Sequence, residues 1–201
     1  MQVIERAGGT ALIAAAAGTV LGMAHHPTHL SSGFVSQMAH GVLLTFSALT
    51  TFGFMTFAAA RGPRPAILAG IICYAFALFG QVGAGMINGF VVPALAEHRA
   101  IVERDMFLLA WEINQAYAGL GVVAAGLAIL LWSLDLLGRR SHESRAIGAL
   151  GVAAGGGPAA LLLSGAIEMN VTGAFLAYSA HAAWGAAVGI HLLRGKAGST
   201  A

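Results

Sequence analysis

The sequence predicts an all-α integral membrane protein built as a six-helix bundle. Of its 201 residues, 58% are hydrophobic and only 9% are charged, whereas a soluble domain carries about 25% charged residues. Apolar runs of roughly 18 or more residues, enough to cross a bilayer, recur along the chain. We therefore expect a single transmembrane domain that covers residues 1–201 and has the lipid bilayer as a partner.

Charged and turn-forming residues divide the chain into six candidate helices. The interruptions are HHPTHLSSG, RGPRP, EHRAIVERD, GRRSHESR and EMNVTG. The helices are expected at residues 7–24, 34–60, 66–93, 106–137, 146–167 and 172–193. The third and fourth exceed the roughly 20 residues that a crossing needs, so they are expected to tilt or to project beyond the bilayer. The first also resembles a secretory signal peptide, but we count it as a spanning helix.

Arginine and lysine are distributed unevenly between the two ends of these helices. One end has Arg6, Arg61, Arg64, Arg139, Arg140, Arg145, Arg194 and Lys196, and the other has Arg99 and Arg104. Because cytoplasmic loops carry an excess of positive charge, both termini are expected to be cytoplasmic, in a bacterial-type inner (plasma) membrane. These basic residues flank the spans and do not form a run with interleaved aromatic residues, so we expect no nucleic-acid partner.

Polar side chains within the apolar runs gather in the half that this topology places toward the outer face. On four helices they recur three, four or seven residues apart, which puts them on one face of each helix. The stripes are Gln37, His40, Ser47 and Thr51; Tyr74, Gln81 and Asn88; Glu112 and Gln115; and Tyr178, His181, Trp184 and His191. Because a charge that faces lipid costs several kcal/mol, the stripes are expected to surround a buried polar site in the outer leaflet half.

The three helix hairpins show a faint internal repeat. Odd helices end in polar residues (MAHHP, MINGF and IEMN), and even helices carry polar residues early (SQMAHG, AWEINQA and AYSAHAAW). This pattern predicts a three-hairpin repeat that places the polar residues at similar depth. The small-xxx-small patterns GTVLG, GVAAG and GAAVG predict close packing between helices.

The histidines in these stripes indicate a metal or haem site. Imidazole is the commonest protein ligand of transition metals and also ligates haem iron. His40 and His181 are expected at matched depth, so either both hold one haem b from opposite faces, or one ligates the iron and the other lines an open position. Copper and zinc accept the same nitrogen donors. The other residues expected to line this cofactor site are Gln37, Gln115, Trp184 and Asn88.

Three further residues are candidates for catalysis beside such a centre. Glu112 is a carboxylate at membrane depth, where a charged group rarely lacks a role. Asn114 and Tyr178 could polarise a substrate or help to transfer a proton. Structural roles are open as well: His40 and His181 could each bond a neighbouring helix, and Glu112 could be protonated. The HHPTH loop is either a metal-binding cluster or a polar cap.

The segment MAHGVLLTFSALTTFGF resembles the second helix of the haem–copper oxidase core subunit, in which a histidine followed by a small residue ligates low-spin haem. The first three helices also resemble the small membrane styrene oxide isomerases, which bind haem b through such a histidine. By position only His40 matches that ligand; the resemblance also suggests Asn88 and Tyr74 as polar wall residues, although the isomerase pattern does not align clearly at these two positions. The resemblance covers roughly 60 residues, and the chain has six expected helices where the isomerases have four. The chain also lacks the paired histidines that form the copper site of the oxidases.

Three functions are compatible with these features. The resemblance implies a haem-dependent oxidoreductase or isomerase that meets a small molecule or redox partner on the outer face. Polar stripes also describe a transport path, so a permease for a metal ion, proton or small solute is the alternative, favoured by the Gly155–Pro158 segment GGGP. The third is a non-catalytic subunit of a larger membrane complex, and the chain could also form a homo-oligomer.

Overall fold

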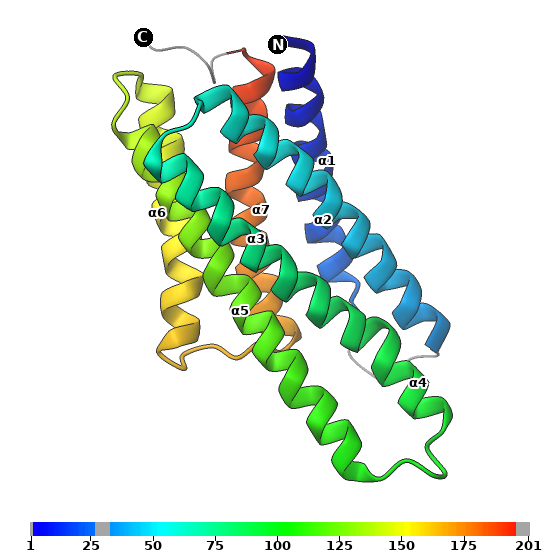
Figure 1. Ribbon diagram of the computed structural model, residues 1–201. Coiled ribbons are helices and arrows are strands. Elements are labelled where there is room, and N and C mark those ends of the chain that lie inside the picture. The colour runs from blue at the N-terminus through cyan, green and yellow to red at the C-terminus, as the bar shows by residue number, and fades with distance from the viewer. Residues whose placement is uncertain (1, 27–32, 196–201) are drawn as a thin grey trace.

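The computed structural model describes residues 2–26 and 33–195. This part of the chain is 87% helical and has no strands, as predicted. The helices are α1 (Gln2–Ala24), α2 (Gly33–Arg61), α3 (Pro65–Met86), η1 (Ile87–Val91), α4 (Val92–Glu97), α5 (Arg104–Leu137), α6 (His142–Leu163) and α7 (Val171–Leu193). Because α3, η1 and α4 follow one another without a break, they form six rods in one elongated bundle (Figure 1).

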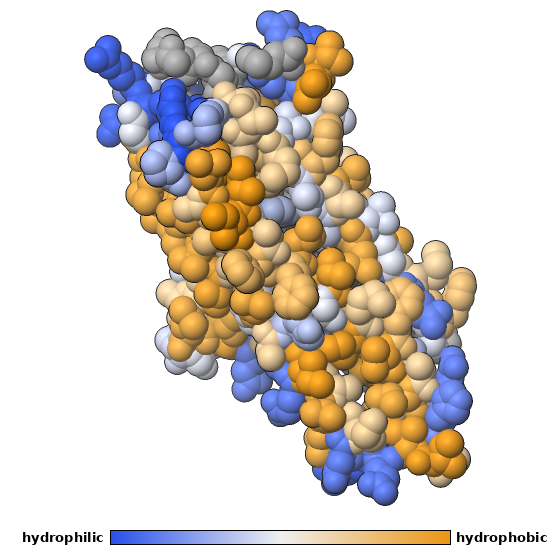
Figure 2. Space-filling view, viewed as in Figure 1, coloured by the Kyte–Doolittle hydropathy of each residue, from blue (hydrophilic) through white to orange (hydrophobic). Residues whose placement is uncertain are grey.

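Five of these rods have the length and composition to cross a membrane. They are α1, α2, the continuous segment Pro65–Glu97, α5 and α6. The sixth, α7, is not among them, because its histidine, tyrosine, tryptophan and glycine residues make it less apolar. Figure 2 shows hydrophobic residues over the flank of the bundle and hydrophilic residues gathered toward its ends. The chain is a multi-pass helical membrane protein.

The sequence divides its arginine and lysine residues into a larger and a smaller set, one for each end of the helices. The described arginines of the larger set lie at one end of the bundle, named here the arginine-rich end. They are Arg6, Arg61, Arg64, Arg139, Arg140, Arg145 and Arg194, and Lys196 is outside the described residues. Helix α1 begins and helix α7 ends at this same end (Figure 1). The structure therefore has the predicted hairpin order, whereas the side of the membrane stays a prediction.

Ion pairs connect the helices at the arginine-rich end. Asp135 of α5, whose side chain is 7% exposed, accepts hydrogen bonds from Arg61 Nε at 2.9 Å and from Arg64 Nη1 at 2.8 Å. On the other side of the bundle, Glu143 of α6 lies 3.3 Å from His191 Nδ1 of α7. Although Asp135 and His191 lie near helix ends, both are largely buried against these partners.

The boundaries of α6 differ from the expected 146–167 by about one helical turn. The helix begins early because the Ser141 hydroxyl caps it, accepting a hydrogen bond from the Ser144 backbone N–H at 3.4 Å. It ends early because the chain turns at Gly165, whose φ of 73° suits glycine. Pro158 lies inside the helix and does not interrupt it. The GGGP segment is therefore regular helix.

The third rod was expected as a regular helix over 66–93 but contains the π-helical segment η1. The Val92 N–H bonds the carbonyl of Ile87, one residue further back than in an α-helix. Proline at position 93 lacks an N–H, and its ring crowds the carbonyl four residues earlier. The wider π turn of η1 makes room for the Pro93 ring at the start of α4. Such segments occur frequently at functional sites.

A layer of aromatic rings fills the middle of the bundle. This aromatic layer consists of Phe54, Phe57, Tyr74, Trp132 and Trp184. The two tryptophan rings stack with centroids 6.1 Å apart and planes 10° from parallel, and both side chains are fully buried. Each indole N–H donates to a backbone carbonyl, that of Ile67 for Trp132 and that of Ile147 for Trp184. The layer is therefore dry, and its polar atoms are satisfied.

Two pairs of glycines let helix backbones touch, as the small-xxx-small patterns predict. A Cβ at Gly126 of α5 would lie 2.5 Å from the carbonyl oxygen of Gly155 in α6. A Cβ at Gly9 of α1 would lie 2.6 Å from the carbonyl oxygen of Gly189 in α7. No side chain fits at either contact, so α6 packs tightly on α5, and α7 packs tightly on α1.

Candidate functional site

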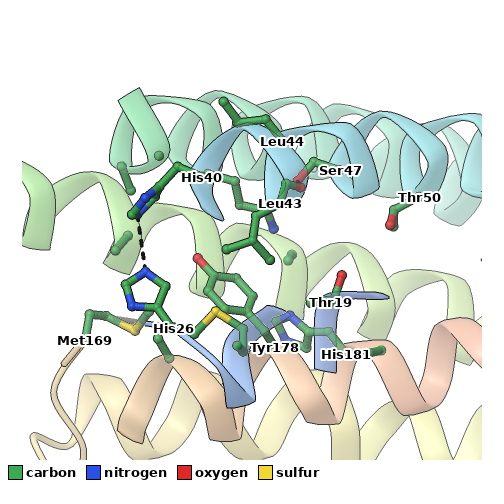
Figure 3. A pocket seen from close by; sticks show the side chains of 18 of the residues that line it. Thr19, His26, His40, Leu43, Leu44, Ser47, Thr50, Met169, Tyr178 and His181 are labelled. Atoms are coloured by element: carbon green, nitrogen blue, oxygen red, sulfur yellow. Dashed lines mark hydrogen bonds between the residues drawn. The ribbon is translucent and has the colours of Figure 1, made fainter. Parts of the chain in front are cut away.

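A cavity of about 180 Å³, named here the chamber, lies between the helices (Figure 3). Its lining residues lie on the side of the aromatic layer away from the arginine-rich end. Its wall includes residues of every rod except α6. It extends from His26 and Asn170 at one end to Phe54 and Ile129 at the other. On the same volume measure a water molecule needs about 10–15 Å³, so the chamber has room for about a dozen waters or one small organic molecule.

The chamber wall is mostly apolar with a few polar side chains. The polar members that concern the predicted site are His26, His40, Asn88, Asn114, Tyr178 and His181. Among the described lining residues, none is aspartate, glutamate, lysine or arginine. An apolar wall with a few convergent polar groups is typical of a small-molecule or cofactor site.

His40 projects from α2 into the chamber and is held in a defined tautomer. Its Nδ1 donates a hydrogen bond to the backbone carbonyl of Ser36 at 2.8 Å, because a carbonyl can only accept. In the neutral ring, Nε2 therefore carries the lone pair. That nitrogen lies 3.3 Å from Nε2 of His26, and the two rings meet edge to face at 84° (Figure 3). The pair brings the end of α1 together with the start of α2.

His181 and Asn114 present buried polar atoms that have no protein partner in the described part of the chain. His181 of α7 is 9% exposed, and neither ring nitrogen has a hydrogen-bond partner. Asn114 of α5 is 3% exposed, and its Oδ1 is likewise unpaired. A buried polar group without a partner costs about 1–3 kcal/mol. Both residues line the chamber, so a molecule bound there would supply the missing hydrogen bonds or metal bonds.

The structure brings together five of the nine residues predicted for the site. His40, His181, Asn88, Asn114 and Tyr178 line the chamber. They come from α2, η1, α5 and α7. Members of the predicted stripes of α2, the third rod and α7 therefore converge at the chamber, whereas the α5 stripe of Glu112 and Gln115 does not line it. All three members of the third-helix stripe, Tyr74, Gln81 and Asn88, also line it.

The other four predicted residues lie elsewhere, which corrects the expected site. Glu112 is exposed on α5, because a residue two positions from Asn114 points about 200° away around the helix. Gln115 donates to the Met169 carbonyl at 3.2 Å. Trp184 belongs to the aromatic layer, where it is fully buried. Gln37 is half-buried on α2 but is not among the lining residues.

Two kinds of chamber residue were not predicted. His26 lies just after α1, in the HHPTH loop that the sequence left as either a metal cluster or a polar cap. The next histidine of that loop, His29, is outside the described residues. The thioethers of Met23 and Met169 also line the chamber. Only the loop offered a signal in the sequence, since methionine is common in apolar cores.

The chain was compared with protein families, with curated proteins and with solved structures, and no match was found. Within residues 2–26 and 33–195, no three His, Cys, Asp or Glu side chains come together as a metal-binding group. The chemistry open to the described chamber residues is therefore that of three imidazoles, neutral amides, two phenols, aliphatic hydroxyls and thioethers.

Proposed function

We propose that this protein holds a histidine-ligated transition-metal centre, haem b or a metal ion, in the chamber and acts in redox or isomerase chemistry on a small molecule. The observation that carries the proposal is His181, a buried imidazole with two unpaired nitrogens that faces the same cavity as His40. With the arginine-rich end placed in the cytoplasm, the chamber lies in the outer half of the bilayer. The small molecule then enters from the outer face.

The two imidazoles have the properties of metal ligands. His40 donates its Nδ1 proton to the Ser36 carbonyl, and metal-bound histidines usually make this type of supporting hydrogen bond. His181 is buried without a competing hydrogen bond in the described part of the chain. Both therefore fit a ligand role at a haem or at a metal ion. Such a centre, when bound, supplies a Lewis-acidic or redox-active position.

The other polar residues of the chamber wall bind and orient the small molecule. The unpaired Oδ1 of Asn114 accepts a hydrogen bond from a donor on that molecule, and Tyr178 and Asn88 offer further polar contacts. Glu112, the third candidate for catalysis in the sequence, is exposed on α5 and does not line the chamber. Asn114 and Tyr178 are therefore the better candidates for contact with a substrate.

The aromatic layer favours a closed binding chamber over a transport path. Phe54 lines the chamber and also packs on both Trp132 and Trp184, with ring centroids 5.3 and 5.4 Å away. These rings lie between the chamber and the arginine-rich end. A permeating ion would have to pass through this dry layer, which holds no charged side chain among its five members. We therefore rank a permease as the second candidate function, after the metal-centre protein.

An absorption spectrum combined with metal analysis of the purified protein tests the proposal. We expect either a Soret band or about one equivalent of a transition metal, and we expect His40→Ala or His181→Ala to remove or shift that signal. His98→Ala is the matched control, because His98 makes the same type of bond, to the Ala94 carbonyl at 2.9 Å, but is exposed and outside the chamber. Protein that contains neither haem nor metal would contradict the proposal.

A further inference from the structure

We infer that His26 and His40 form a copper(I) site at the outer end of the chamber, with a thioether of the chamber wall as the third donor. The inference rests on the proposed function in that it names the metal and its ligands. It differs from the haem form of that function, because it takes His26 rather than His181 as the partner of His40. The carrying observation is the approach of the two Nε2 atoms to 3.3 Å.

The separation of the two nitrogens suits neighbouring ligands of one metal ion. Imidazole nitrogens about 2.0–2.1 Å from a shared ion lie about 3.3–3.6 Å apart at tetrahedral or trigonal angles. Two axial ligands on opposite faces of a haem would be about 4 Å apart, twice that bond length. The observed 3.3 Å therefore fits two adjacent ligands. With His26 in this position, Nε2 of His40 faces a second imidazole nitrogen rather than open space.

The ring of His40 is arranged so that Nε2 is its available donor, and Nε2 of His26 is the nitrogen that faces it. The Nδ1–H of His40 donates a hydrogen bond to the Ser36 carbonyl, and the His40 side chain packs closely against Gly89 of η1. His26 follows the end of α1, where its backbone N–H bonds the Met23 carbonyl at 3.2 Å, and its side chain reaches His40 of α2. The edge-to-face angle of 84° keeps the rings from stacking. Neutral imidazoles held in this way bind copper, zinc and iron.

The absence of charge in the chamber wall favours copper(I) over a divalent ion. None of the described lining residues is a carboxylate, so a divalent ion would bring two uncompensated charges into an apolar cavity. A monovalent ion brings half that charge. Met23 and Met169 line the same cavity, and thioether sulfur selects the soft copper(I) ion over zinc. Figure 3 shows Met169 at the same end of the chamber as His26.

The same two nitrogens can also share a proton in a direct N–H···N hydrogen bond, and a titration with copper distinguishes the two arrangements. Purified protein in detergent is stripped with a chelator and titrated with copper(I) under reducing conditions, in competition with a chromogenic copper(I) chelator. We expect one copper per chain. X-ray absorption is expected to show two nitrogen ligands and at least one sulfur. A hydrogen-bonded pair without metal would give no binding above the controls.

Alanine variants of the two histidines test which residues bind the copper(I) ion. His26→Ala and His40→Ala are each expected to weaken copper(I) binding at least tenfold. His25→Ala and His98→Ala are the controls, because both are exposed and each bonds a carbonyl of its own helix, Leu21 and Ala94 respectively. If His40→Ala fails to fold, His26→Ala still decides the question, because position 26 lies beyond the end of α1.

The outcomes separate this inference from the proposed function. A Soret band that survives His26→Ala but not His181→Ala would overturn the copper site and leave the haem form of the proposed function in place. Copper binding that is unaffected by His26→Ala would also overturn the inference. Protein that takes up neither copper nor haem would overturn both.

Discussion

Gly89 of η1 lies so close to α2 that a Cβ added to it would stand 2.5 Å from the Cβ of His40. Only glycine therefore allows η1 to pack against this histidine. The neighbouring Ser36 hydroxyl donates to the Asn88 carbonyl at 3.0 Å and reinforces the same contact. The orientation of His40 thus depends on a π-helical segment far along the chain, which connects an irregularity of the backbone to the candidate site.

Gly89→Ala is expected to displace His40 and to destabilise the protein. Because the added methyl group would collide with a Cβ rather than with a flexible side-chain end, α2 and η1 must separate, at a cost of about 1–3 kcal/mol. Thermal unfolding in detergent measures this loss. Gly41→Ala is the control, since a Cβ there meets nothing within 4 Å and alanine favours helix. Equal melting temperatures for the two variants would contradict the close packing of Gly89.

Asn114→Leu is expected to stabilise the ligand-free protein. The leucine has a similar size and removes an unpaired buried Oδ1, which relieves about 1–3 kcal/mol of desolvation cost. Gln115→Leu next to it is expected to act in the opposite direction, because it removes the bond to the Met169 carbonyl, worth about 0.5–1.5 kcal/mol. Melting temperatures of the two variants provide the comparison. A loss of stability in Asn114→Leu would mean that Asn114 serves the fold rather than a ligand.

Asp135→Asn is expected to be strongly destabilising. Asp135 contacts Arg61, Arg64 and Arg139, and the Arg61 side chain is only 1% exposed. Removal of one partner from a buried ion pair costs about 3–5 kcal/mol, because a charge is left without compensation. Asp105→Asn, an exposed position in the first turn of the same helix, is the control. The prediction fails if both variants unfold at the wild-type temperature.

Trp184→Phe is expected to weaken the aromatic layer. The phenyl ring cannot donate to the Ile147 carbonyl, which leaves a buried acceptor unpaired at a cost of about 1–3 kcal/mol. Trp111→Phe should change stability by no more than about 0.5 kcal/mol, since Trp111 is 48% exposed on α5. Chemical or thermal unfolding followed by far-ultraviolet circular dichroism compares them without relying on tryptophan emission. Matching unfolding curves would show that Trp184 makes no net contribution to stability.

Hydrophobicity and the positions of charged and turn-forming residues were enough to predict most of the helices. The second and fourth were placed within two residues of α2 and α5 at each end, because charged residues and turns bound long apolar runs there. The displaced ends of α6 depend on the cap at Ser141 and on the positive φ of Gly165. The π turn near Pro93 depends on how one proline ring fits against a carbonyl. These are local geometries that hydropathy does not report.

The candidate site was predicted in part. His40, His181 and Asn88 were found because a polar residue in an apolar run must face something other than lipid. Glu112 was assigned to the interior by the same rule, but it is exposed near the start of α5, whose 34 residues exceed the roughly 20 that a crossing needs. Trp184 shared the helix face of His181 but lay deeper, in the aromatic layer.

The sequence alone determined that this chain is a helical membrane protein with six rods, because apolar length and the positions of charges depend on residue type and order. It also determined that histidine and amide groups must be accommodated at membrane depth. Only the tertiary structure decided that Asn114 faces the chamber while Glu112 does not, and that His26 meets His40 at 3.3 Å. Those outcomes depend on the rotation of each helix and on the path of a loop. Both are set by contacts between residues far apart in the chain, such as Gly89 with His40.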